Sequence, residues 1–414
     1  MNNTMKSKDF ANTESLLKQA FDVCAELNNE IGTYAGEQQK IRYFLDLMEN
    51  HIHSRKGNPP KLVIFGTDFP IELAHSLTGE LPYYAVGGSR VVQEYSDDFV
   101  PRDTDPVTRA ALGELFANEN WKETSLVIVP CSSDAQRKAA YLLQNQGWNV
   151  ITIWIPAVKS ELSHKSFLSE MDHTIRAICR HVKRRYSVFS LNKSAAYFNK
   201  VRCSIRSFMD AALKNESVFP GVFTMAVIDS FFMADDLDEW QERLNDLTAE
   251  LNEYPSEKKD CPHTLVIGSP IIYPNYKIPQ LLTASGIEIS GFIDSRTGIF
   301  EDDFGDEEKG LEALAHYYFE HDSSSAFVQN DSLISAIKSA IDRNKPDGII
   351  WHVLKGHIEY DFELNRCEKL FEEMDLPVIR LETDYQYQDV EQLRIRIEAF
   401  GELMTQKRRE INHE

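Results

Sequence analysis

Short apolar runs that end in turn residues recur along the chain, and amphipathic stretches separate most of them. In the first half these runs are KLVIFG (61–66), SLVIVP (125–130) and NVITIWIP (149–156). Their length and apolar character predict buried strands. The amphipathic stretch from Asp134 to Gln146 joins two of them, which is the βαβ pattern of a parallel sheet. The pattern therefore predicts an α/β domain that ends with helical stretches at 160–186 and 192–215.

The second half has the same alternation. Its apolar runs are TLVIGSP (264–270), IEISGFID (287–294), DGIIWHVL (347–354) and LPVIRLET (376–383). Leu393, Ile397 and Phe400 follow the helical period and predict a final amphipathic helix. We therefore expect an α/β fold with two doubly wound, Rossmann-like domains, each built on a parallel sheet.

The length of 414 residues exceeds what one hydrophobic core usually supports, so we expect several parts. Residues 1–57 form an N-terminal helical cap, because apolar residues recur there at helical spacing without a strand run. These residues are Leu16, Leu17, Ala20, Phe21 and Cys24. Residues 58–215 form the first α/β domain, and 216–260 form a helical, acidic connector. Residues 261–414 form the second α/β domain with the C-terminal helix.

The formal charge of -21 repels phosphate backbones and anionic lipid, so we expect neither nucleic acid nor a membrane as the main partner. A local basic pocket for a small anion stays compatible with this charge. No apolar run approaches the roughly 20 residues that cross a bilayer, and the start MNNTMKSKDF resembles no signal peptide. We therefore expect a cytoplasmic protein. The six cysteines form no CxxC pair, and we interpret them as free thiols.

Polar residues follow several predicted strands, at the edge where open α/β sheets bind ligands. Glu72 lies in the first turn of a helix, where it is either a functional carboxylate or an acid favoured by the helix dipole. Asp105 precedes a proline and fits an N-cap position, which alone would explain it. Cys131 and Ser133 follow the run at 125–130 and enter a helix, where amides and hydroxyls bind anions. A lone cysteine there is either a reactive thiol or a small buried residue.

The second half offers Gly268-Ser269-Pro270 at the end of its first strand, where turn chemistry explains most of the sequence. Lys355 and His357 follow the run at 347–354. A histidine there is a ligand, an acid or base, or a polar residue with its hydrogen bonds satisfied.

Taken in order, six segments resemble the subunits of the 2-hydroxyacyl-CoA dehydratase and benzoyl-CoA reductase family, over residues 61 to 404. The most specific are VLKGHIEYDFELNR and LPVIRLETDYQYQDVEQLRIRIEAFGELM, with support from PIELAHSLTG, PRDTDPVTRAALG, SSDAQRKAAYLL and IGSPIIYPN. The resemblance implies two domains around a cleft, an acyl-CoA substrate, and a homologous subunit in a hetero- or homodimer. It also implies a 4Fe-4S cluster that receives an electron from a separate ATP-dependent activator.

Three cysteines hold the cluster in that family, and this chain departs from all three. By the resemblance, their positions correspond to Asp105, Ser133 and His357, the last within Lys355-Gly356-His357-Ile358 where the family has a K-x-C-D pattern. We expect these three residues to approach one another across the cleft. Thiolates are the usual ligands of iron-sulfur clusters, so this set is a poor cradle for one. Cys131 could replace only one thiolate.

Two functions from different classes follow. In the first, which we prefer, the chain is a partner or scaffolding subunit that keeps an acyl-CoA cleft without a cofactor. In the second, it is a re-equipped enzyme, a lyase of the (R)-2-hydroxyacyl-CoA dehydratase type or an acyl-CoA reductase. Its catalytic candidates are His357, Asp105 and Glu72; its cofactor-binding candidates are Ser133, Cys131 and Lys355.

For that enzyme, Asp105 and His357 are the candidate ligands of a mononuclear zinc or iron(II), because carboxylate and imidazole suit those ions. A weaker alternative keeps an atypical 4Fe-4S cluster. The candidate CoA contacts are Arg102, Lys138 and Lys355, and each is otherwise a solvated surface charge.

Overall fold

The computed structural model describes residues 22, 24–29, 40–51, 59–300, 303–304, 310–321 and 326–413. Most of the predicted N-terminal cap, including Leu16, Leu17, Ala20 and Phe21, lies outside these residues. Within it, residues 24–29 are helical, and Cys24 is buried. Helix α2 (Ile41–Asn50) buries Ile41, Phe44, Leu45 and Met48 against the rest of the molecule.

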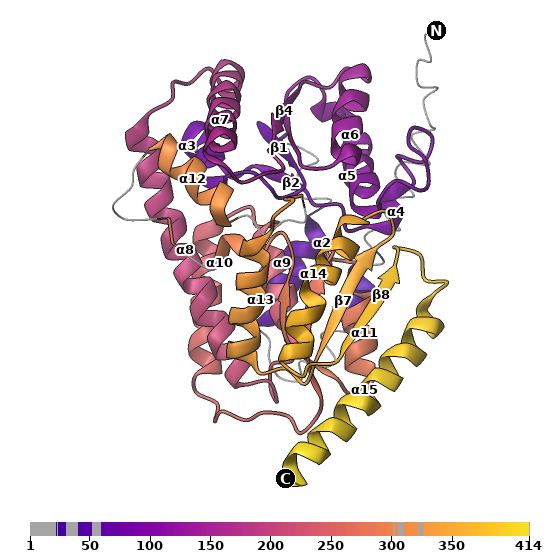
Figure 1. Cartoon of the computed structure of the whole chain (residues 1–414). Coiled ribbons are helices and arrows are strands. Elements are labelled where there is room, and N and C mark those ends of the chain that lie inside the picture. The colour runs from indigo at the N-terminus through magenta and orange to yellow at the C-terminus, as the bar shows by residue number, and fades with distance from the viewer. Residues whose placement is uncertain are drawn as a thin grey trace.

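Two four-stranded parallel sheets form the centre of the molecule (Figure 1). The first contains β1 (Leu62–Phe65), β2 (Tyr83–Ala85), β3 (Leu126–Cys131) and β4 (Val150–Trp154) in the order β2-β1-β3-β4. The second contains β5 (His263–Gly268), β6 (Glu288–Ile293), β7 (Gly348–Leu354) and β8 (Val378–Thr383) in the order β6-β5-β7-β8. The expected α/β fold with two doubly wound, Rossmann-like sheets is confirmed. Strand β2, at only three residues, was not predicted.

Helices cover both faces of each sheet. The first half contains α3 (Ile71–Thr78), α4 (Arg90–Gln93), α5 (Pro106–Ala117), η1 (Glu119–Trp121), α6 (Asp134–Asn145), α7 (Glu161–Val182) and α8 (Val188–Lys214). The second contains α11 (Lys277–Ala284), η2 (Gly298–Phe300), α12 (Leu311–His321), α13 (Asp331–Asn344), α14 (Glu359–Glu373) and α15 (Val390–His413). Leu393, Ile397 and Phe400 of α15 are buried, as their period predicted.

Two helices of opposite character join the halves. Helix α9 (Gly221–Phe231) is apolar and almost wholly buried, and it packs against α2, α8 and β6. Helix α10 (Leu237–Leu251) is acidic and amphipathic, and buries only one stripe. The acidic character predicted for 216–260 therefore belongs to its second part, because α9 lies inside the core.

Alternate strand residues point into different cores. Leu62 and Ile64 face a central apolar core that both sheets share, whereas Val63 and Phe65 face an outer core under α5 and α6. The second sheet has the same arrangement. Ile350 faces the central core, and the strand residues on either side of it face an outer core under α13 and α14. Central strands covered on both faces explain the continuous apolar runs in the sequence. Among the described residues, no helix has the length and apolarity to cross a bilayer.

Candidate functional site

The loops after the strands of both sheets enclose one cavity of about 420 Å³. In each sheet the chain leaves the two central strands toward opposite edges, so the loops after these strands diverge and leave a crevice. The two crevices face each other here. The lining residues include Thr67 and Asp68 after β1, Ser132 and Ser133 after β3, Pro270 after β5, Arg296 after β6, Gly356 and His357 after β7, and Asp105 before α5.

Asp105 and His357 meet within this cavity. The His357 Nε2 atom lies 3.3 Å from the Asp105 Oδ1 atom, which matches the approach predicted from the sequence. The same Oδ1 atom accepts a hydrogen bond from the backbone N–H of Thr108 at 2.8 Å, so Asp105 is also the N-cap of α5. The Asp105 carboxylate thus caps α5 in the first half and contacts His357 in the second half.

A serine completes the contacts of the His357 ring. The Nδ1 atom lies 3.1 Å from the Ser269 Oγ atom, and that oxygen also accepts the Leu354 N–H at 2.9 Å. Ser269 is 2% exposed and does not line the cavity. Its hydroxyl therefore orients the ring and does not face a ligand.

The charges of this pair reinforce each other. Burial lowers the pKa of His357, but the hydrogen bond and charge of Asp105, with the charge of Glu359, outweigh burial and raise it above 6.5. Burial raises the pKa of Asp105, but contacts with His357 and the Thr108 N–H outweigh burial and place it below 3.8. The geometry therefore favours an imidazolium paired with a carboxylate.

Gly356 allows the two halves to come this close. Its φ of +95° is in the left-handed region that favours glycine, and a Cβ there would lie 3.3 Å from atoms of Asp105. The turn after β7 therefore packs directly on the start of α5.

Ser133 lines the same cavity, but its hydroxyl caps a helix. Its Oγ atom accepts the Gln136 N–H at 3.2 Å, and the Gln136 Oε1 atom accepts the Ser133 N–H at 3.1 Å. This reciprocal pair is a capping box at the start of α6. Ser133 thus shares the cavity with Asp105 and His357 without a hydrogen bond to either.

Three other candidates lie apart from the cavity lining. Cys131 is buried in the outer core of the first sheet, and burial raises the pKa of its thiol to about 11. Glu72 is fully buried, where it pairs with Arg202 and accepts a hydrogen bond from the Tyr318 hydroxyl at 2.7 Å. Lys355 is exposed and pairs with Asp384 at 2.7 Å.

The two remaining candidates for CoA contacts, Arg102 and Lys138, are exposed side chains outside the cavity lining. None of the five residues just described lines the cavity.

Arg296 lines the cavity and was not predicted. Its guanidinium pairs with Asp229 and Asp294 and donates to the Ile271 carbonyl at 2.8 Å. Two sequence signals could have found this cluster. Asp294 ends a predicted strand and Arg296 follows it, and Asp229 is the one charged residue in the mainly apolar run GVFTMAVIDSFF.

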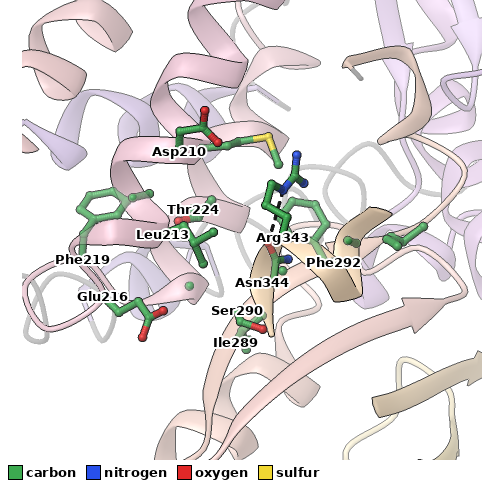
Figure 2. A pocket seen from close by; sticks show the side chains of 16 residues that line it. Asp210, Leu213, Glu216, Phe219, Thr224, Ile289, Ser290, Phe292, Arg343 and Asn344 are labelled. Atoms are coloured by element: carbon green, nitrogen blue, oxygen red, sulfur yellow. Dashed lines mark hydrogen bonds between the residues drawn. The ribbon is translucent and has the colours of Figure 1, made fainter. Parts of the chain in front are cut away.

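A second hollow lies away from the strand ends, between α8, α9, β6 and α13 (Figure 2). Its residues include Asp210, Glu216, Arg343 and Asn344, and Arg343 Nε donates to Asn344 Oδ1 at 3.3 Å. Its volume of about 40 Å³ holds only a few water molecules. The larger cavity is therefore the candidate ligand site.

The donors in that cavity do not fit an iron-sulfur cluster. The three positions that the resemblance assigns to cluster ligands offer a carboxylate, a hydroxyl and an imidazole, and no cysteine lies among the described lining residues. Iron-sulfur clusters are held chiefly by thiolates. Across the described part of the chain, no group of three or more His, Cys, Asp or Glu residues is arranged to hold a metal ion.

Comparison with known proteins gives a consistent result. The family model for the 2-hydroxyglutaryl-CoA dehydratase D-component matches residues 67–404. The chain is 22% identical to the candidate dehydratase subunit YjiM of Escherichia coli (strain K12), over 75% of this chain and 83% of that protein. It is 23% identical to the (R)-phenyllactyl-CoA dehydratase beta subunit of Clostridium sporogenes, over 61% of this chain and 68% of that protein. The chain therefore belongs to the 2-hydroxyglutaryl-CoA dehydratase D-component family.

Proposed function

We propose that this chain is a cluster-free subunit of a 2-hydroxyacyl-CoA dehydratase-type assembly in the cytoplasm. It keeps an acyl-CoA cleft and pairs with a homologous subunit that carries the 4Fe-4S cluster and receives electrons from the ATP-dependent activator. The observation that carries the proposal is the direct contact of Asp105 with His357, at two positions that the resemblance assigns to cluster ligands.

The donors at these positions already have protein partners. The Asp105 Oδ1 atom holds both the His357 ring and the Thr108 N–H, the His357 Nδ1 atom holds Ser269, and the Ser133 hydroxyl caps α6. A cluster would require these side chains to leave their partners and turn toward one centre. Buried polar groups without partners cost about 1–3 kcal/mol each, so the present contacts oppose that change.

The cavity supports a ligand of acyl-group size. Its volume of about 420 Å³ lies in the usual range of small-molecule sites, and it occupies the strand-end crevices where such folds bind ligands. The name of the Clostridium sporogenes relative states an acyl-CoA substrate, which supports this class for the present chain.

Iron and acid-labile sulfide analysis of anaerobically purified protein tests the proposal. The wild-type chain should contain neither after reconstitution with iron and sulfide. The triple variant Asp105→Cys, Ser133→Cys, His357→Cys should gain both, because it restores thiolates at the three positions. A matched control with three cysteines at the exposed positions Asp103, Glu123 and Glu368, outside the cavity lining, should not. Stoichiometric cluster in the wild-type chain would overturn the proposal.

One observation favours a second candidate function, a re-equipped acid–base enzyme acting on an acyl-CoA or related substrate. The Asp105–His357 pair lines the cavity, and the raised pKa of His357 suits a proton donor. In that case the chain alone should turn over a 2-hydroxyacyl-CoA, and His357→Gln should abolish the activity while Lys138→Ala leaves it intact. One bound zinc or iron per chain, lost in His357→Gln, would assign the mononuclear version.

A further inference from the structure

A cavity of about 270 Å³ lies where the N-terminal part, the first half and the second half of the chain meet. We call it the junction cavity. Its walls include Glu26 from the N-terminal part, Arg90 from α4, and Asn275, Tyr385 and Tyr387 from the second half. Among the described residues, none lines both this cavity and the larger one at the strand ends. The junction cavity is therefore a separate space with its own chemistry.

The side-chain amide of Asn275 lies in the wall of the junction cavity with an unsatisfied oxygen. Asn275 is 8% exposed, and its Oδ1 atom receives no hydrogen bond from any described residue. Its backbone N–H, by contrast, donates to the Ile272 carbonyl at 2.8 Å. A buried amide oxygen without a donor lowers stability, so native proteins rarely keep one without a reason. Beside a cavity, such an oxygen indicates a ligand.

The guanidinium of Arg90 lines the same cavity without a partner. Arg90 is exposed, and no carboxylate or carbonyl of the described residues pairs with it. Arg109, in the next helix, instead pairs with Asp97 at 2.5 Å. In a chain with a formal charge of -21, an arginine left without an acid beside a cavity is suited to a carboxylate from outside the chain.

The other walls supply the remaining contacts of a small zwitterion. Glu26 is exposed and adds a carboxylate, which together with the Asn275 amide oxygen suits an ammonium group. Tyr387 is 50% exposed and offers an aromatic ring to an apolar side chain. The volume of about 270 Å³ is below the range of about 300–1,000 Å³ that is usual for drug-sized ligands, so the ligand is small.

We propose that the junction cavity binds a free α-amino acid. Its carboxylate pairs with Arg90, and its ammonium group donates to Asn275 and Glu26. The Asn275 amide presents its oxygen to the ligand by rotation about its last side-chain bond, and no hydrogen bond of the Oδ1 atom opposes this rotation. The inference is independent of the proposed function, because it requires neither an acyl-CoA nor a cluster.

The position of the cavity gives the ligand a structural effect. The Tyr385 hydroxyl donates to the Gly87 carbonyl at 2.8 Å, and the ring packs on apolar residues of α5 and β7. Asp105 caps α5 and His357 follows β7, so Tyr385 lies behind the contact between these two residues. An amino acid that binds both halves should therefore hold them together at this contact.

Isothermal titration of the full chain with a panel of free L-amino acids tests the proposal. At least one should bind, whereas acetate and methylamine, which each carry one of its two charged groups, should bind about tenfold or more weakly. Arg90→Gln and Asn275→Ala should each weaken binding of that amino acid about tenfold or more. Arg409→Gln, which changes an exposed arginine of α15, should not. Absence of binding at millimolar concentrations would overturn the proposal, and so would acetate that binds equally well.

Asn275→Ala also distinguishes a ligand contact from a structural role. Because the Oδ1 atom has no partner in the free chain, this variant should keep the wild-type Tm but lose the rise in Tm that the amino acid produces. A lower Tm of the free variant would assign the amide a structural role and overturn the proposal. Hydrogen exchange then locates the ligand. The amino acid should protect residues 88–91 and 385–387, whereas protection of 132–136 instead would place it in the larger cavity and contradict the proposal.

Discussion

The two halves share one strand order but hold their cavity loops by different means. In the first half, helix caps do so: Asp105 caps α5, and Ser133 caps α6 through a capping box. In the second half, buried charges do so. Arg296, which lines the cavity after β6, pairs with Asp229 and Asp294.

This difference should make the two halves unequal in their response to substitution. A cap contributes about 1 kcal/mol and can be replaced by another polar side chain. Removing one partner of a buried ion pair leaves a charge in the interior and costs about 3–5 kcal/mol. Substitutions among the buried charges of the second half should therefore cost more stability than substitutions of the helix caps in the first half.

The strongest test removes a buried cation from each half. Arg296→Met should lower the free energy of unfolding by about 3–5 kcal/mol, because Asp229 and Asp294 then stay buried without it. Arg202→Met in the first half should cost less, because it leaves the single carboxylate of Glu72. Urea unfolding measures both. The triple variant Asp229→Asn, Asp294→Asn, Arg296→Met should recover much of the lost stability. If Arg202→Met lowered the free energy of unfolding as much as Arg296→Met, the two halves would not differ in this respect.

The stability of the two halves should also depend on pH over different ranges. In the second half, burial lowers the pKa of His263, but Asp347 and Glu216 outweigh it and raise the pKa from 6.5 to about 9. Its stabilisation is complete below pH 6.5 and is lost as the pH rises through 9, an effect of about 3 kcal/mol. In the first half, burial raises the pKa of Glu114 from 4.5 to about 8, so its stabilisation is lost between those values.

Two variants check this result by urea unfolding across pH. His263→Gln should flatten the fall in stability between pH 6.5 and 9, and Glu114→Gln should flatten it between 4.5 and 8. Unchanged slopes in both variants would contradict the assignment of these groups.

The contact between the halves should appear in the titration of His357. Asp105→Asn keeps an N-cap for α5 but removes the charge beside the ring, so the pKa of His357 should fall. Histidine resonances followed by NMR against pH give the value. Ser133→Ala, in the same cavity, should leave it unchanged; a similar fall in that variant would mean that the Asp105 charge is not the cause.

The smallest effect concerns the cap of α6. Ser133→Ala should lower the free energy of unfolding by about 1 kcal/mol, because the Gln136 N–H loses its acceptor. Ser133→Asp should retain most of the stability, since aspartate also caps helices. A loss near that of Arg296→Met in urea unfolding would show that the first half is as rigid as the second.

Much of the fold could be predicted from the sequence, because buried central strands require continuous apolar runs. All four strands of the second sheet and three of the first were found in this way. Strand β2 escaped because three residues carry no period, and the burial of α9 escaped because a uniformly apolar helix has no amphipathic stripe.

The candidate site was predicted only in part. Strand-end polarity pointed to Asp105, Ser133 and His357, which the structure places in one cavity. The same rule also pointed to Lys355 and Cys131, which do not line it. Polarity after a strand cannot distinguish a side chain that faces the crevice from one that turns outward or into the core.

The sequence by itself determined the order of strands and helices and the acidic stretch of the connector, because both depend on neighbouring residues. Only the tertiary structure decided that the start of α5 meets the turn after β7, and that Arg296 pairs with Asp229 of α9. These contacts join segments far apart in the chain, and they exist because two sheets pack on one shared core with their crevices facing each other.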